Sequence, residues 1–166
     1  MEKVISIGKQ NFASLRENHY FFVDKSHFIK DWWENGDEIT LITRPRRFGK
    51  TLNMSMLDCF FSNKYAARGD LFEGLGVWKE EKYRELQGKY PVIFLSFAAV
   101  KADQLSEAKI QIKQQIARVY EENRYLLDGD LLSGNEKKAY NEVNLHMGDA
   151  EAAAALNNMS MYLARY

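Results

Sequence analysis

The residues best suited to chemistry lie in one short stretch that ends in Gly49, Lys50 and Thr51. Glycine lets the backbone approach an anion closely, a lysine ammonium can reach phosphate oxygens, and a threonine hydroxyl can hold Mg²⁺. The whole stretch, residues 44–51, reads Arg-Pro-Arg-Arg-Phe-Gly-Lys-Thr. This pattern predicts a phosphate-binding loop, a variant of the Walker A motif, that takes ATP together with Mg²⁺.

Each position of this loop has an expected role. Residues 45–48 should supply backbone donors to the phosphates, and Pro45 can begin the turn because no donor is needed there. Thr51 is the expected metal ligand, and the candidates for stabilising transferred charge are Lys50, Arg46 and Arg47. The expected nucleotide-binding set is Pro45, Arg46, Arg47, Phe48, Gly49, Lys50 and Thr51.

One position departs from the usual pattern, in which a glycine stands five residues before the Gly-Lys-Thr ending. In this chain that position is Arg44. A plain surface turn between two elements would also accommodate the stretch, and its arginines would then be solvated or would form surface ion pairs. The motif alone leaves both interpretations open.

The loop requires an element on each side to hold it. Within residues 38–43 the apolar side chains Ile39, Leu41 and Ile42 lie close together, which is typical of a strand covered on both faces. From about residue 50 to 61, Leu52, Met56 and Phe60 recur at helical spacing. Strand, loop and helix in this order are the layout of a P-loop, so we expect an α/β fold, a three-layer P-loop NTPase-like arrangement around a parallel sheet.

The segments around this unit contain further elements. Residues 91–97 read as a second strand, and Ser96 near its end could face the phosphate site. Residues 4–7 and 20–23 could be short strands. We expect Asp24 to cap a helix that ends at Asn35 and Gly36, because those residues tolerate positive φ.

The second half of the chain is predicted to be mainly helical. An apolar stripe begins near residue 105, Ser133 and Glu136 have the spacing of a capping box, and Asp149 could cap the last helix. We find no internal repeat and no linker. The sequence therefore predicts a single domain over residues 1–166, with residues 1–37 as a lead-in and residues 38–166 as the P-loop core.

Several stretches together resemble the AAA-ATPase-like family of bacterial and archaeal proteins. The resemblance rests on the loop at 44–51, on residues 12–18 and 22–26, and on residues 90–97. Members of that family carry the same arginine-rich loop, which implies that Arg44 is a family feature. The resemblance also implies that the lead-in lies against the nucleotide. Three aromatic residues could then contact the adenine instead of filling the core: Phe12, Tyr20 and Phe22.

An acidic strand end that would help to place Mg²⁺, the Walker B element, is missing from the sequence. The run that ends in Asp128 is too short, and the following Gly129 reads as a turn. In the resembled family an acidic segment follows later, and a nuclease-like domain often lies near the C-terminus. We therefore expect an incomplete fold, the N-terminal part of a larger ATPase-like protein, whose exposed apolar sheet surface would favour self-association.

The overall composition argues against several classes of protein. The chain has 166 residues, 23 Lys+Arg and 23 Asp+Glu, so its formal net charge is zero, which argues against a dedicated nucleic-acid-binding domain. Its single cysteine, Cys59, excludes an intrachain disulfide and is expected to be a small buried side chain. Without a signal peptide or a membrane-spanning run, a cytoplasmic protein is expected.

Two functions therefore compete at this point. The first is nucleoside triphosphate binding, with ATP hydrolysis left open. The second is a non-catalytic interaction domain that keeps the shape of a P-loop without its ligand. Arg44 and the missing carboxylate favour the second, whereas Lys50 beside Thr51 favours the first, because a purely structural turn needs neither residue.

Overall fold

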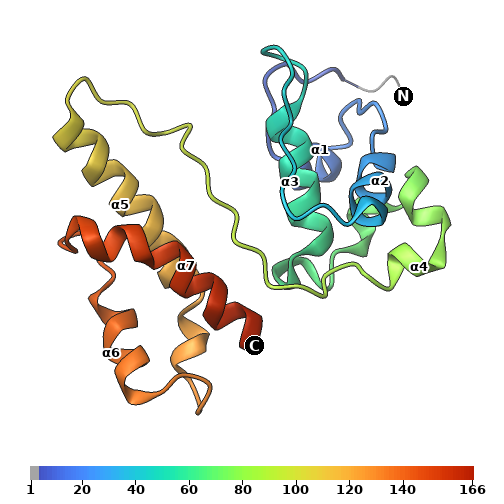
Figure 1. Ribbon diagram of the computed structural model, residues 1–166. Coiled ribbons are helices and arrows are strands. Elements are labelled where there is room, and N and C mark those ends of the chain that lie inside the picture. Colours follow the sequence, from blue (N-terminus) through green and yellow to red (C-terminus); the bar gives the residue numbers. More distant parts are fainter. Residues whose placement is uncertain (1–3) are drawn as a thin grey trace. The chain divides into compact units, whose positions relative to one another are not determined.

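A computed structural model describes residues 4–166 of the chain, which are largely helical (Figure 1). The helices alternate with short 3₁₀ segments, labelled η. In chain order the elements are α1 (Phe12–Glu17), α2 (His27–Asn35), α3 (Lys50–Phe61), η1 (Asn63–Tyr65), η2 (Gly69–Phe72), η3 (Gly76–Lys79), α4 (Glu81–Arg84), α5 (Leu105–Glu122), η4 (Arg124–Leu127), α6 (Gly134–Glu142) and α7 (Asp149–Arg165).

The predicted α/β fold with a parallel sheet is wrong for the part of the chain that the structure describes. Residues 38–43 and 91–97 have no regular secondary structure, and neither pairs into a sheet. A single parallel bridge, Ser62 to Tyr90, and one bond from the Phe21 amide to the Val4 carbonyl (2.9 Å) are isolated contacts rather than ladders. Apolar, extended segments become strands only when neighbouring backbone is available to pair with them, and here Ile39 and Leu41 are 89% and 82% exposed.

The chain divides into two compact units, one running to Val92 and the other spanning Ile93–Tyr166. Each has its own hydrophobic core. The extent of the P-loop core predicted from the sequence stays a prediction.

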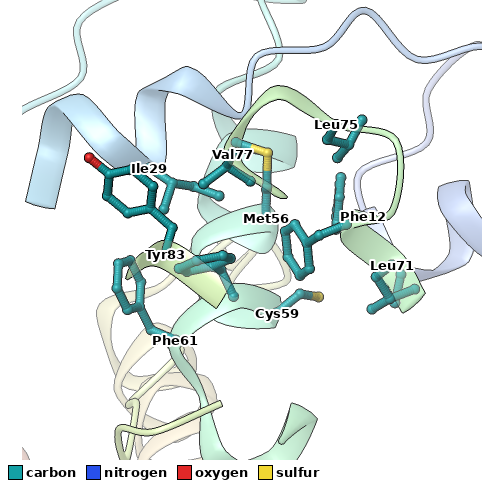
Figure 2. Packing of buried hydrophobic residues seen from close by; sticks show 12 residues of the cluster. Phe12, Ile29, Met56, Cys59, Phe61, Leu71, Leu75, Val77 and Tyr83 are labelled. Carbon is teal, nitrogen blue, oxygen red and sulfur yellow. The ribbon is translucent and has the colours of Figure 1, made fainter. Parts of the chain in front are cut away.

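Helix α3 is central to the core of the first unit. Met56 and Phe60 are fully buried, as the apolar spacing predicted, and so is Cys59, whereas Leu52 of the same predicted stripe is half-buried. Burial raises the pKa of the Cys59 thiol to about 11, so the expectation of an inert, buried cysteine is confirmed. Around α3, Figure 2 shows Phe12 from α1, Ile29 from α2 and Val77 from η3 converging on Met56 and Cys59.

Helix α2 covers another part of this core through its tryptophans. The Trp32 and Trp33 rings lie 5.3 and 5.5 Å from the Phe61 ring. The helix ends as predicted, because Gly36 has φ 64° and closes it in the left-handed conformation. Its start differs, since the helix begins at His27 and Asp24 lies outside it.

The second unit is built around tyrosines of α5, α6 and α7. The Tyr120 hydroxyl donates to the Ala155 carbonyl (2.8 Å) and the Tyr140 hydroxyl to the Tyr120 carbonyl (2.6 Å), which ties the three helices together. The predicted capping box of Ser133 and Glu136 is present at the start of α6. Asp149, expected as a cap, is instead the first residue of α7 and pairs with lysines of α5.

Within residues 4–166, no helix combines the length and apolar character that crossing a bilayer requires.

Candidate functional site

The predicted phosphate loop connects an extended segment to the start of α3. Two of its residues have left-handed backbone, Arg47 at φ 69° and Gly49 at φ 78°. A non-glycine residue in this conformation costs about 1–3 kcal/mol, and such strain concentrates at binding loops. These two left-handed residues lie immediately before α3, which begins at Lys50 as the motif predicted.

The backbone amides of this turn have no acceptor within the described part of the chain. The first N–H groups of α3 cannot find partners inside the helix, and Gly49 offers no side chain to cap them. The amides of residues 46–49 likewise donate no hydrogen bond to any residue between 4 and 166. Amides of this kind at a helix start, together with the helix dipole, favour an anion.

The Lys50 side chain folds back over the loop. Its ammonium donates to the Arg44 carbonyl, and to the Pro45 carbonyl at 3.2 Å. Two neutral carbonyl partners at the mouth of the loop hold the charge near the amides. Phosphate oxygens are stronger acceptors for an ammonium than carbonyls, so the same side chain can exchange these partners for an anion.

Arg44 contributes to the loop through its backbone. Its carbonyl is one of the partners of Lys50, and its φ lies outside the left-handed region. A glycine is therefore not required at this position, because any residue can supply a carbonyl at negative φ. Arg44 is therefore compatible with the conformation that the loop has here.

A cavity of about 700 Å³ lies against the loop, within the range of about 300–1,000 Å³ typical of small-molecule sites. Its walls come from the loop and from the lead-in. The lining residues are Ile7, Gly8, Lys9, Gln10, Pro45, Arg46, Arg47, Phe48, Gly49, Lys50, Thr51 and Leu52. All seven residues predicted to bind nucleotide are therefore brought together at one cavity.

The cavity is strongly cationic. Lys9, Arg46, Arg47 and Lys50 line it, and no described lining residue is acidic. Within residues 4–166 none of these four side chains forms an ion pair with a carboxylate. Cations gathered without counter-charges repel one another, so binding an anion there is favourable. The surface ion pairs considered for Arg46 and Arg47 are not formed among these residues.

The family resemblance implied that the lead-in lies against the nucleotide, and the lead-in does line this cavity, but Lys9 was not among the residues predicted for the site. The Phe12 amide donates to the Ser55 hydroxyl of α3 at 3.0 Å, and this buried bond fixes the start of α1 against α3. Lys9 bonds the Ser14 hydroxyl at 3.1 Å and lies 5.7 Å from the centre of the Tyr20 ring. No local spacing connects a lysine at position 9 with a loop near position 47, so only the folded chain reveals this cation.

None of the three aromatic residues predicted to contact adenine is among the described residues that line the cavity. Phe12 is fully buried and packs 5.5 Å from the Phe22 ring and 5.2 Å from the Phe72 ring, so it belongs to the core. Neither Tyr20 nor Phe22 is among the described lining residues. The exposed aromatic ring at this cavity is instead Phe48, which is 58% exposed.

The remaining candidates lie in the second unit. The Ser96 hydroxyl accepts a bond from the Ala98 amide at 3.3 Å, and its role at the phosphate site stays a prediction. Gly129 after Asp128 has φ 76°, which fits the predicted turn. Over the described residues, no three or more His, Cys, Asp or Glu side chains gather as a metal-binding group.

Comparison with known proteins finds a family model that covers this site. A family model described as "Predicted AAA-ATPase" matches residues 6–159 and therefore includes both walls of the cavity. An uncharacterized protein in the vnfD 5' region of Azotobacter chroococcum mcd 1 is 36% identical over 96 residues, which are 57% of this chain and 17% of that protein. The chain thus matches only a small part of that relative's length. No solved structure matches the chain.

Proposed function

The chain belongs to the AAA-ATPase-like family of predicted AAA-ATPases, and on that premise we propose that it binds ATP with Mg²⁺ in the cavity at the start of α3. One observation carries the proposal: unpartnered backbone amides and four cations face a cavity of ligand size that contains no described carboxylate. Each of these features favours a polyanion, and together they match the charge and hydrogen-bonding needs of a triphosphate.

In this proposal the loop residues divide the phosphate chain between them. The amides of residues 46–51 donate to phosphate oxygens, and Lys50 leaves the carbonyls of Arg44 and Pro45 to contact the β- and γ-phosphates. Arg46 and Arg47 offset the remaining negative charge and are the candidates for stabilising a transferring phosphoryl group.

Thr51 fits the metal. Its side chain is exposed and lines the cavity. Mg²⁺ is usually held by few protein groups, by substrate phosphates and by water, so one hydroxyl beside the phosphates is a suitable protein ligand. When bound, the metal would neutralise part of the phosphate charge, with Thr51 as its ligand from this loop. Hydrolysis also needs a carboxylate and a group that orients water, so the proposal here is one of binding.

The competing function is an interaction domain with a degenerate loop. Arg44 and the missing carboxylate favour it in the sequence. Arg44 argues less strongly for it here, because its φ lies outside the left-handed region and it meets Lys50 through its carbonyl, whereas the missing carboxylate still counts in its favour. The exposed apolar side chains of residues 38–43 are the observation that still favours contacts with other proteins. Self-association through this segment and a nuclease-like partner domain remain proposals.

Calorimetric titration with Mg·ATP tests the proposed function. Wild-type protein should bind, and Lys50→Ala should weaken binding by at least about tenfold, because an ionic hydrogen bond contributes about 1.5–3 kcal/mol. Lys89→Ala removes an exposed lysine outside the cavity and should leave the affinity unchanged. Circular dichroism verifies that all three proteins are folded. Equal affinities of wild type and Lys50→Ala would refute the proposal.

A further inference from the structure

Lys25 is a cation of the first unit that neither the motif nor the cavity wall accounts for. It precedes α2, yet its ammonium nitrogen lies 3.9 Å from the point where a side chain on Gly49 would begin. The side chain is exposed, and within residues 4–166 it forms no ion pair or hydrogen bond. An ammonium group that has no partner among residues 4–166 thus lies beside Gly49, the last residue before α3.

The residues on either side of Lys25 are anchored firmly to the start of η3. The Asp24 carboxylate accepts bonds from the Ser26 amide (2.8 Å) and the Gly76 amide (2.7 Å). The Ser26 side chain is fully buried, and its hydroxyl accepts from the Val77 amide at 3.0 Å. Three bonds therefore fix the backbone before and after Lys25.

The packing at this anchor is tight. A side chain on Gly76 would lie 2.8 Å from the His27 ring and 3.4 Å from the Asp24 carboxylate, so the segment and η3 can approach this closely only at a glycine. Partial burial favours the neutral form of Asp24, but the hydrogen bonds from Ser26 and Gly76 outweigh it and lower the pKa of this carboxyl. Asp24 is therefore ionised near neutral pH and keeps the anchor formed.

We infer that Lys25 is a second phosphate-binding ammonium, supplied to the loop from outside the motif and held in position by Asp24 and Ser26. The inference rests on the function proposed above. Fixing the backbone on both sides reduces the conformational freedom that a lone surface lysine would lose on binding. Lys25 and Lys50 then supply ammonium groups to the phosphate chain from two separate segments.

The test measures the affinity for Mg·ATP in the full chain as a function of salt. Lys25→Ala should weaken binding by about tenfold at low salt, with a smaller loss at high salt, because the lost contact is an ion pair open to solvent. Lys25→Arg should restore most of the affinity. Asp24→Asn should produce an intermediate loss, because the lysine stays but its anchor is weakened. Lys89→Ala is the matched control, an exposed lysine outside the site.

Each outcome decides one claim. If wild type binds and Lys50→Ala does not, while Lys25→Ala binds like wild type, the inference about Lys25 is overturned and the proposed function stands. A Lys25→Ala loss that is the same at all salt concentrations, or that Lys25→Arg does not rescue, overturns an electrostatic role as well. If wild type binds no Mg·ATP, both the proposed function and the inference fall. Thermal unfolding without nucleotide should be unchanged in Lys25→Ala, since that side chain makes no hydrogen bond or ion pair within residues 4–166.

Discussion

The first backbone amides of a helix have no partner within the helix, and helices α3 and α6 differ in how those amides are satisfied. At α6 the Ser133 hydroxyl accepts from the Glu136 amide (3.3 Å), and the Glu136 carboxylate accepts from the Ser133 amide (2.8 Å). The second carboxylate oxygen binds Arg165 of α7 at 2.7 Å. At α3 the preceding residue is Gly49, which has no side chain, and the first amides find no acceptor among residues 4–166.

This difference separates a helix start that serves structure from one that can serve a ligand. The chain uses Ser133 and Glu136 to satisfy the amides of α6 and to neutralise a nearby arginine. The start of α3 has several cations beside it and no described carboxylate in its cavity. An anion from solution would supply what the side chains of α6 supply internally.

The largest effect is expected from reversing charge at the open start. The double variant Arg46→Glu/Arg47→Glu places two carboxylates against a triphosphate, so affinity for Mg·ATP should fall by about a hundredfold or more. Lys138→Glu reverses an exposed charge on α6 and should leave the affinity unchanged. Calorimetry measures both. Retained binding in the double variant would show that the cations around the loop do not define the site.

A smaller effect is expected from adding one methyl group at each helix start. Gly49→Ala imposes a left-handed backbone on alanine, which should reduce the free energy of unfolding by about 1–2 kcal/mol and weaken nucleotide binding. Gly134→Ala, at the first position of α6, has negative φ and open space around it. Alanine there should be neutral or stabilising by up to about 1 kcal/mol. Denaturant unfolding compares the two, and an equal loss of stability would contradict the assigned loop geometry.

The smallest effect concerns pH and is confined to α6. The hydrogen bond from Arg165, followed by those from Ser133, lowers the pKa of Glu136 from 4.5 to about 2. Because the folded pKa lies below the unfolded one, the stabilisation is complete above about pH 4.5 and is lost as the pH falls toward 2. A carboxyl titration followed by NMR should show this low midpoint. In Glu136→Gln the corresponding loss of α6 stability in acid should disappear. A Glu136 midpoint near 4.5 would mean that the capping box is weak in solution.

Sequence reasoning succeeded where a local interaction decides the structure. The bounds of α3, its buried stripe, the left-handed end at Gly36 and the capping box at Ser133 all depend on residues within one or two turns of each other. The loop residues also gather at one cavity, because a short loop keeps its neighbours together. These features follow from helix geometry and capping chemistry alone.

Sequence reasoning failed where segments that are distant in the sequence must contact each other. Residues 38–43 and 91–97 have the composition of strands, but pairing depends on partners that no local pattern can guarantee. Asp24 and Asp149 were expected to cap helices, yet their carboxylates bind Gly76 and Lys109, which lie 52 and 40 positions away. Lys9 and Lys25 reach the loop through folding of the lead-in, so nothing in their spacing from Lys50 marked them.

The central claim is that the amides at the start of α3 are open to a phosphate chain. Resonances of the backbone amides can be followed by NMR while Mg·ATP is added to the full chain. We predict that the amides of residues 46–52 shift as nucleotide binds, because they become hydrogen-bond donors to phosphate, while the amides of residues 134–137 in α6 stay in place as the internal control. Unchanged resonances at 46–52, or equal shifts at both helix starts, would contradict the account.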